Sequence, residues 1–268
     1  MHKASCWLPV LLALTLWRAV TCAAPIPLYS YHESEPFVLK HEPGLSEVFT
    51  REFNRLAPAT LQLQLIPIER DALNAKVRRH EPLLILWANK LWFQGLEPGL
   101  VPSQPLFWDS DVVVSLRAHP QPYQTPADLT GHRIAAMSGH VYVGIDALAL
   151  AGRLQRIDTE NEDGLMTLLQ ARQVDAMLLS YSTVLYWQKH RAGLVPLYVA
   201  NAPHDAFSRH ILMTPELSGL ESGINAVLAK LQQDPQWKQA LQHFGIHALV
   251  DPLQLDLDEL EELPIDAP

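Results

Sequence analysis

The sequence has 268 residues, including 20 Lys or Arg, 29 Asp or Glu and only 2 Cys, and 48 % of its residues are hydrophobic. A chain of this length and hydrophobicity buries a large core without disulfides or metal ions, which excludes wholesale disorder. The formal net charge is −9 and the only adjacent basic pair is Arg78-Arg79, which excludes a general nucleic-acid-binding protein. The length favours two lobes or one large domain.

Residues 1–23 have the pattern of a secretory signal peptide. Lys3 gives a positive start, Leu8 to Trp17 is an apolar run, and small residues up to Ala23 offer a cleavage site. The run is too short to span a bilayer, which takes about 20 residues. We therefore expect export to the periplasm, with lipid attachment through Cys22 as a less favoured alternative. Both cysteines lie in this segment, so we expect no thiol chemistry after cleavage.

The body alternates predicted strands and helices, which is typical of an α/β fold with mostly parallel sheets. The predicted strands are 28–31, 61–68, 83–87, 112–116, 133–137, 154–157, 174–179, 194–199 and 209–213. The predicted helices are 44–56, 70–81, 138–152, 161–172, 181–190, 220–231 and 235–244. Residues 89–109 read as a long loop rich in aromatic residues, Gly and Pro.

This order predicts two lobes, with the end of the chain returning to the first one. We expect residues 24–111 to form the first part of lobe one, 112–200 to form lobe two, and 201–250 to return to lobe one. Residues 251–268 follow as an acidic tail with seven carboxylates and no Lys or Arg. Such a run is typical of disorder, while its alternating leucines leave a partner-docking strand or short helix as an alternative.

Five stretches occur in the order found in bacterial extracellular solute-binding proteins of family 3, the polar amino-acid-binding type that serves ABC transporters. These stretches are Tyr31 to Phe37, Gly44 to Val48, Ser103 to Phe107, Ala127 to Ala135 and Val174 to Met177. The sequence resembles this family, as a divergent member, over about residues 28–245.

The resemblance implies a type II periplasmic binding protein fold. Each lobe would be a mostly parallel sheet flanked by helices, and two crossing strands near Asp111–Ala118 and Leu197–Met213 would join the lobes. A small ligand would bind in the cleft between the lobes, which would close by hinge motion. The expected partners are this ligand and a membrane permease, and we expect a monomer without cofactor.

The two charged anchors of an amino-acid site are missing on this alignment. The family Arg that pairs with the ligand carboxylate corresponds to Leu96, and the family Asp that pairs with the ligand ammonium corresponds to Ser180. Only Arg offers a rigid bidentate fork to a carboxylate. We therefore predict a ligand other than a standard α-amino acid.

The remaining candidate ligand contacts are aromatic and polar. Aromatic rings suit flat, apolar or cationic ligands, and backbone N–H groups at a helix start suit anions. From the resemblance we expect ligand contacts from Tyr31, Phe37, Trp87, Asn89, Phe107, Ser138, Gly139, His140 and Ser180. Tyr31 and Trp87 have the positions that most favour the cleft. For the other aromatic residues a core position is the alternative, and for Ser138 a helix cap.

We predict neither catalysis nor a metal site. The 12 His are scattered, and no His-Glu-x-x-His arrangement or comparable zinc-ligand pair occurs. Ser138 and Ser180 lack a Gly-x-Ser-x-Gly context. Two alternatives remain open. One is a ligand sensor that serves a membrane signalling protein, and the other is a dehydratase-like enzyme using Glu33, Glu35 or His32 as acid or base.

Overall fold

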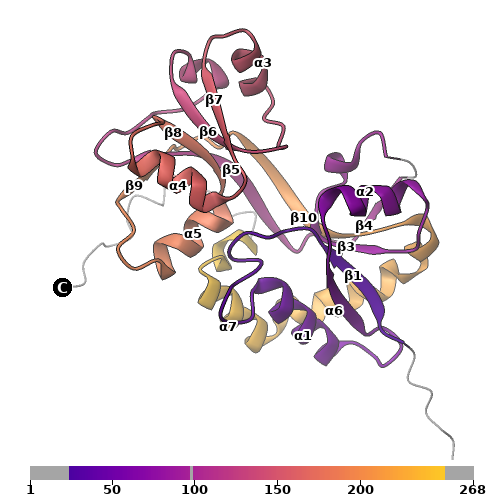
Figure 1. Cartoon of the computed structure of the whole chain (residues 1–268). Coiled ribbons are helices and arrows are strands. Elements are labelled where there is room, and N and C mark those ends of the chain that lie inside the picture. The colour runs from indigo at the N-terminus through magenta and orange to yellow at the C-terminus, as the bar shows by residue number, and fades with distance from the viewer. Residues whose placement is uncertain (1–23, 97–98, 251–268) are drawn as a thin grey trace, which may run out of the picture.

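The structure, a computed structural model, describes residues 24–96 and 99–250. The chain forms two lobes that lie side by side and are joined by two long strands, β5 and β10 (Figure 1). The predicted signal peptide and the predicted acidic tail lie outside the described residues. None of the described helices has the length and hydrophobicity that a membrane span requires.

Lobe one is built around the parallel strands β1, β2 and β3. β1 lies between the other two and pairs with both, and the short β4 pairs antiparallel with β10. The strands are β1 (Ile26–Ser30), β2 (Leu63–Pro67), β3 (Leu84–Ala88) and β4 (Val101–Pro102). The helices are α1 (Leu45–Leu56), α2 (Arg70–Arg78), α6 (Glu221–Gln233) and α7 (Pro235–Phe244), with 3-10 turns η1 (Lys90–Phe93), η3 (Pro215–Leu220) and η4 (His247–Val250).

Lobe two repeats this layered plan with its own parallel core. β6 lies between β7 and β8 and pairs parallel with both, and β9 pairs antiparallel with β5. The strands are β6 (Arg133–Met137), β7 (Gln155–Thr159), β8 (Ala176–Ser180) and β9 (Leu197–Val199). The helices are α3 (Ile145–Leu150), α4 (Glu162–Gln170) and α5 (Tyr181–His190), with a 3-10 turn η2 (Pro126–Leu129).

β5 (Phe107–Leu116) and β10 (Asp205–Met213) join the two lobes. Residues 205–209 of β10 pair antiparallel with residues 107–111 of β5, while the rest of β10 pairs with β3 in lobe one. The rest of β5 pairs with β8 and β9 in lobe two. The strand order is therefore continuous, β2-β1-β3-β10-β5-β8-β6-β7. The α/β class and the two crossing strands agree with the sequence-based expectation.

Both crossing strands begin earlier than the sequence pattern predicts. β5 begins at Phe107, inside the segment predicted as a loop, and β10 begins at Asp205 rather than at Arg209. The predicted lobe boundary between 111 and 112 therefore falls inside β5. The early part of each strand contains polar residues, such as Asp109 in β5 and Asp205 in β10. The sequence pattern missed these parts, because strands buried on both faces are usually continuous apolar runs. These polar residues turn out to lie at the junction of the lobes.

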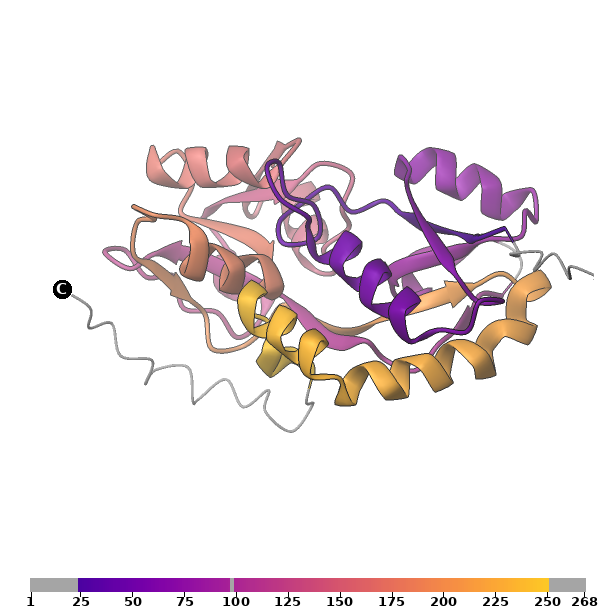
Figure 2. The same ribbon diagram turned by 90° about the horizontal axis from the view of Figure 1, so that it is seen from below.

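The helices of the last part of the chain pack on α1 of lobe one. α6 and α7 lie along α1, and the side chains of Phe49, Phe53, Ile224 and Trp237 share one core cluster (Figure 2). The helical spacing of Leu45, Val48, Phe49 and Phe53 puts these residues on the buried face of α1, as predicted. α7 also packs against α5 of lobe two.

The loop between β1 and α1 (residues 31–44, called the 31–44 loop below) closes tightly on the start of α1. The Leu45 and Ser46 N–H groups donate to the carbonyls of Pro36 and Phe37, at 2.8 and 3.1 Å. A Cβ on Gly44 would lie only 2.5 Å from the Phe37 carbonyl oxygen. This close approach requires glycine at position 44.

Gly44→Ala is therefore expected to lower the free energy of unfolding by about 1–3 kcal/mol, because the added methyl group pushes the 31–44 loop away from α1. Urea denaturation measures this loss. Gly219→Ala is the matched control, because a Cβ there meets nothing within 4 Å. Equal stabilities of the two variants would contradict the close approach.

Candidate functional site

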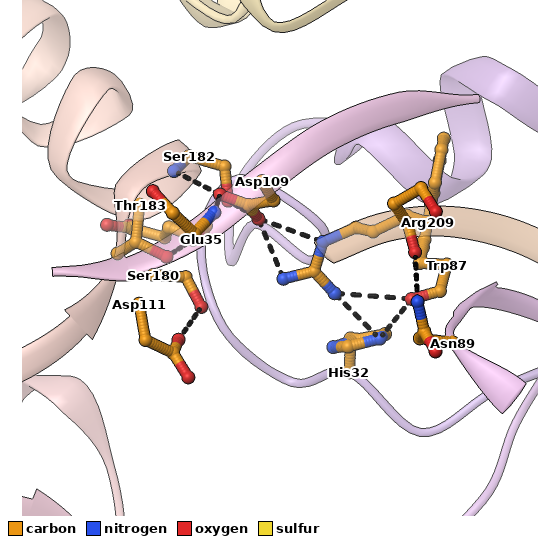
Figure 3. A network of polar contacts seen from close by, with 12 residues as sticks. His32, Glu35, Trp87, Asn89, Asp109, Asp111, Ser180, Ser182, Thr183 and Arg209 are labelled. Carbon is orange, nitrogen blue, oxygen red and sulfur yellow. Dashed lines mark hydrogen bonds and ion pairs between the residues drawn. The ribbon is translucent and has the colours of Figure 1, made fainter. Parts of the chain in front are cut away.

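A buried ion pair joins the two crossing strands. The Arg209 guanidinium on β10 donates from Nε and Nη2 to Oδ2 of Asp109 on β5, both at 2.8 Å (Figure 3). The two side chains are only 3 % and 0 % exposed. Breaking such a pair leaves a buried charge without a partner, which is strongly unfavourable. The pair therefore fixes the two strands to one another.

Asp109 extends this network into lobe two. Its carboxylate accepts hydrogen bonds from the Ser182 N–H at 3.0 Å, from the Ser182 hydroxyl at 2.8 Å and from the Ser110 N–H at 2.9 Å. Ser182 lies in the first turn of α5, where the helix dipole also favours a carboxylate. The buried anion is thus satisfied by groups from β10, β5 and α5.

Arg209 reaches in the other direction into lobe one. Its Nη1 lies 3.2 Å from the Trp87 carbonyl oxygen and 3.4 Å from Nε2 of His32. His32 Nε2 also lies 3.2 Å from the same Trp87 carbonyl. Burial and the neighbouring Arg209 charge hold the pKa of His32 well below its usual range, so this ring is neutral around pH 7.

Aromatic rings surround the Arg209 guanidinium. Its carbon Cζ lies 4.8 Å from the ring centre of Phe37, 5.1 Å from Phe207, 5.5 Å from Trp92 and 5.9 Å from Phe107. These distances are in the range of cation–π attraction. Phe37 and Phe107 were expected to contact a ligand, but both rings are about 1 % exposed and enclose this arginine instead. The protein itself supplies the cation that this aromatic cluster holds.

Trp87 takes a different place from the expected one. Its ring is fully buried in the lobe-one core among Phe37, Phe49 and Phe107, and its Nε1 donates to the Ser46 hydroxyl at 3.0 Å. Ser46 and Phe49, which contact the indole, both belong to α1. The carbonyl of Trp87, rather than its ring, belongs to the network around Arg209.

Asn89 and Tyr31 lie near the same junction. The Asn89 amide donates to the Ser208 carbonyl at 2.9 Å and accepts from the Leu91 N–H at 3.0 Å, so both of its polar ends have partners in the protein. The Tyr31 ring stacks on His32 at 4.5 Å between ring centres. The Tyr31 ring also faces a cation.

That cation is Arg70, at the start of α2. Its guanidinium lies 4.7 Å from the Tyr31 ring centre and 4.3 Å from that of Phe93, and it donates to the Trp92 carbonyl at 2.5 Å and to Asn74 at 3.0 Å. Within residues 24–96 and 99–250, it forms no ion pair with a carboxylate. Arg70 was not a candidate in the sequence, because nothing in a polar helix marks one arginine among several.

The lobe-two candidates Ser138, Gly139 and His140 form a turn rather than a helix start. α3 begins only at Ile145, whereas the sequence predicted a helix from 138. The N–H groups of Ser138 and His140 already donate to the carbonyls of Thr159 and Met137, at 2.9 and 3.2 Å. Gly139 makes this turn possible, because its φ of 73° is in the left-handed region. The expected helix-start anion site is therefore absent from this turn.

The pKa of His140 is sensitive to charges outside its own turn. Burial is the main cause that lowers its pKa, and the positive charges of Arg70, Arg156 and Arg209 lower it further. His140 also contributes to the lowered pKa of His32. Side chains of both lobes thus act on each other across the junction, and His140 is neutral around pH 7.

Ser180 lies beside a carboxylate that the sequence did not reveal as part of the site. Asp111 of β5 is its direct partner in the strand pairing, and the Ser180 hydroxyl lies 3.4 Å from Oδ1 of Asp111. Burial, and then the nearby charge of Asp109, raise the pKa of Asp111 to about 7, while Arg209 opposes the shift. An acidic group is thus present next to the position where the resembling family has its Asp.

We call the resulting cluster the interlobe site. It consists of Tyr31, His32, Arg70, Asp111, His140 and Arg209, contributed by both lobes and by the crossing strands. Within the described ranges, no group of three or more His, Cys, Asp or Glu side chains is arranged to hold a metal ion. The arrangement suits recognition of a small polar molecule by charge and hydrogen bonds.

Comparisons with known proteins agree with this architecture. No family model matches the sequence, and no curated protein matches it. Solved structures do match. An ancestral arginine-binding protein bound to arginine superposes with a TM-score of 0.64 at 12 % identity, covering 83 % of this chain and 99 % of that one. The chain has the two-lobe fold of periplasmic binding proteins.

Two further solved structures have the same fold. The GluR0 ligand-binding core from Nostoc punctiforme in complex with glutamate has a TM-score of 0.64 at 14 % identity, over 83 % of this chain and 100 % of that one. The ancestral amino-acid-binding protein AncCDT-1, a precursor of cyclohexadienyl dehydratase, has a TM-score of 0.62 at 11 % identity, over 82 % and 95 %. The TM-scores show a shared fold, and at these low identities they show the fold alone. The neighbours are mostly small-molecule-binding proteins.

Replacing Arg209 by Met is expected to lower the free energy of unfolding by about 3–5 kcal/mol, because Asp109 keeps its buried charge without a cation. Urea denaturation of the wild type and of Arg78→Met, an exposed control, gives the reference. The double variant Asp109→Asn with Arg209→Met is expected to lose less than the sum of the single losses, because the two side chains interact. Additive losses would argue against the pair.

The raised pKa of Asp111 predicts a pH effect on stability. Between its ordinary pKa of 3.8 and its folded value of about 7, the folded state binds a proton that the unfolded state releases. Stability therefore falls as pH rises through this window, by up to about 1.4 kcal/mol per pH unit from this group. The difference between the wild type and Asp111→Asn, followed by urea denaturation from pH 5 to 8, isolates Asp111 from the histidines common to both. A constant difference across this range would refute the shift.

Proposed function

We propose that this protein is a periplasmic solute-binding protein that captures a small organic ligand at the interlobe site and presents it to an ABC-type transporter. The proposal is supported by the meeting of charged and aromatic side chains from both lobes at the strands that join them. It is also in line with the structural neighbours, which include proteins bound to arginine, glutamine and glutamate. The protein is exported by its N-terminal segment and acts as a monomer.

The charge of Arg70, which forms no ion pair within residues 24–96 and 99–250, carries the choice of ligand. Arg209 is already neutralised by Asp109, and His32 and His140 have lowered pKa values that leave them neutral. Among the described groups of the interlobe site, Arg70 is therefore the cation that remains for a ligand. Its guanidinium is held in place by Trp92, Asn74 and two aromatic rings. A guanidinium fork recognises a carboxylate in two-point geometry. The ligand is an organic acid.

A standard α-amino acid is not the preferred ligand. Leu96, which stands at the position of the family's carboxylate-binding Arg, packs against a small apolar cluster of lobe one. Asp111 replaces the missing Asp only in part, because its pKa of about 7 leaves much of it protonated near neutral pH. In that form it donates a hydrogen bond, which suits a ligand oxygen better than an ammonium group.

Binding, rather than catalysis, is the proposed role. Of the three acid–base candidates, Glu35 is committed to Arg191 and Trp187, and His32 to the Trp87 carbonyl. The third, Glu33, is exposed. A ligand-sensing role for a membrane signalling protein would use the same binding event. The two roles differ in the partner that recognises the ligand-bound form.

A thermal-shift screen tests the proposed ligand class. The panel is succinate, citrate, benzoate, glutamate, arginine and putrescine, and a ligand that binds only the folded state raises Tm with its concentration. We expect a carboxylate without an amino group to give the largest shift. Glutamate or arginine binding at micromolar affinity would overturn the proposed ligand class, and stabilisation by putrescine alone would point to a cationic ligand.

Arg70→Gln is expected to weaken binding of the responding carboxylate at least tenfold, about 1.4 kcal/mol, by loss of a charge-assisted contact. Isothermal titration calorimetry measures this change. Arg78→Gln is the matched control, because Arg78 lies on the same helix and is exposed. Equal affinities of the two variants would remove Arg70 from the site.

A further inference from the structure

One side chain of the 31–44 loop reaches across to lobe two. Oε2 of Glu35 accepts hydrogen bonds from Trp187 Nε1 at 2.8 Å and from Arg191 Nη2 and Nε at 2.8 and 3.1 Å. The carbonyl of Glu35 also accepts from the Thr183 hydroxyl at 2.7 Å. All three partners belong to α5 or to the residue that follows it. A single lobe-one residue thus contacts both ends of this lobe-two helix.

The partners of Glu35 are held firmly in turn. Arg191 also pairs with Asp163 of α4 at 2.8 Å, and its guanidinium lies 3.9 Å from the Trp187 ring centre. Trp187 is fully buried, and the side chains of Glu35 and Arg191 are only 31 % and 28 % exposed. The half-buried Glu35 carboxylate accepts three hydrogen bonds, from the Trp187 indole and the Arg191 guanidinium. Together these interactions are stronger than an ordinary ion pair at the surface.

The same short loop carries residues of the junction. His32 contacts the Trp87 carbonyl and Arg209, and Phe37 covers the Arg209 guanidinium. Glu35 lies between these two positions in the chain, and the backbone after it is fixed to the start of α1. A shift of Glu35 relative to α5 therefore moves the loop that supplies Tyr31 and His32 to the interlobe site.

α5 is also held from its other side by lobe one. Nε2 of His190 lies 2.6 Å from the His243 carbonyl oxygen, and the Lys189 ammonium donates to the Gln242 carbonyl, both on α7. Figure 2 shows α5 lying beside α7, close to the loop that leads into α1. Two parts of lobe one, the 31–44 loop and α7, thus form hydrogen bonds with α5. The α7 contacts use exposed groups, whereas the Glu35 contacts are half buried.

We propose that Glu35 is a positioning residue. Its contacts with Thr183, Trp187 and Arg191, called the clasp below, hold the two lobes in the arrangement that assembles the interlobe site. The part of this inference that concerns ligand affinity rests on the proposed function, whereas the part that concerns lobe arrangement does not. Without the clasp, the ligand-free protein samples other lobe arrangements. The apparent affinity then equals the affinity of the assembled site multiplied by the fraction of molecules that keep this site assembled.

The test compares Glu35→Gln with Glu33→Gln. The first change removes the charge of the clasp with little change in size, and the second alters an exposed carboxylate on the same loop. Spin labels on cysteines placed at Arg78 in lobe one and Leu150 in lobe two, both exposed, report the interlobe distance by pulsed electron resonance. The ligand-free distance distribution is expected to broaden in Glu35→Gln and to stay unchanged in Glu33→Gln.

Affinity provides the second readout. The panel carboxylate with the largest thermal shift is expected to bind Glu35→Gln about tenfold more weakly than it binds the wild type. A change of this size is typical of the coupling between two distant sites of a protein. Glu33→Gln is expected to bind the same carboxylate as tightly as the wild type does. Arg191→Lys, which keeps the charge but loses the fork, is expected to fall between the two. Arg191→Lys also serves as the second variant if Glu35→Gln does not fold.

The outcomes separate the two proposals. An unchanged distance distribution in Glu35→Gln overturns the clasp, whatever binds. A broadened distribution with unchanged affinity overturns its role in assembling the site. If no panel compound binds the wild type, the proposed function loses its support, while the distance measurement still decides whether Glu35 holds the lobes together.

Discussion

The buried pair of Arg209 and Asp109 is the interaction on which the junction of this protein depends. A guanidinium and a carboxylate that are taken out of water are tolerated only when each has hydrogen-bond partners on all sides. The partners come from β3, β5, β10, α5 and the 31–44 loop, so one electrostatic requirement gathers five separate parts of the chain. The buried rings of Phe37, Phe107 and Phe207 enclose the guanidinium of this pair.

This internal pair changes the chemistry that is left for a ligand. The aromatic cluster is already occupied by a cation, so cationic ligands have no empty ring cage here. The groups that remain are the Arg70 guanidinium on α2, the neutral rings of His32 and His140, and the Asp111 carboxyl group, whose pKa is about 7. This local balance of charge supports the anionic ligand that we propose, although the whole chain carries a net charge of −9.

The sequence predicts much of the fold, because apolar periodicity and order along the chain are local properties. The buried face of α1 and the apolar strand β3 follow directly from residue spacing. The site is harder to predict, because it depends on strand pairing. Asp111 joins it only through the register with Ser180. Arg209 joins it only because β10 pairs with β5 over residues 205–209, which brings the Arg209 side chain within reach of Asp109. Trp87 shows the converse, since its family position suggests a cleft while α1 covers its ring.

The continuous sheet has a consequence for how the chain acquires its structure during synthesis. β3 is completely buried in the finished protein, yet one of its two neighbours, β10, is made only after all of lobe two. A nascent chain therefore carries an apolar strand with one open edge while more than a hundred further residues emerge, and open apolar edges are prone to pair with other chains. Because β10 bonds to both halves of the molecule, neither lobe completes its sheet alone, and the two lobes gain their final stability together.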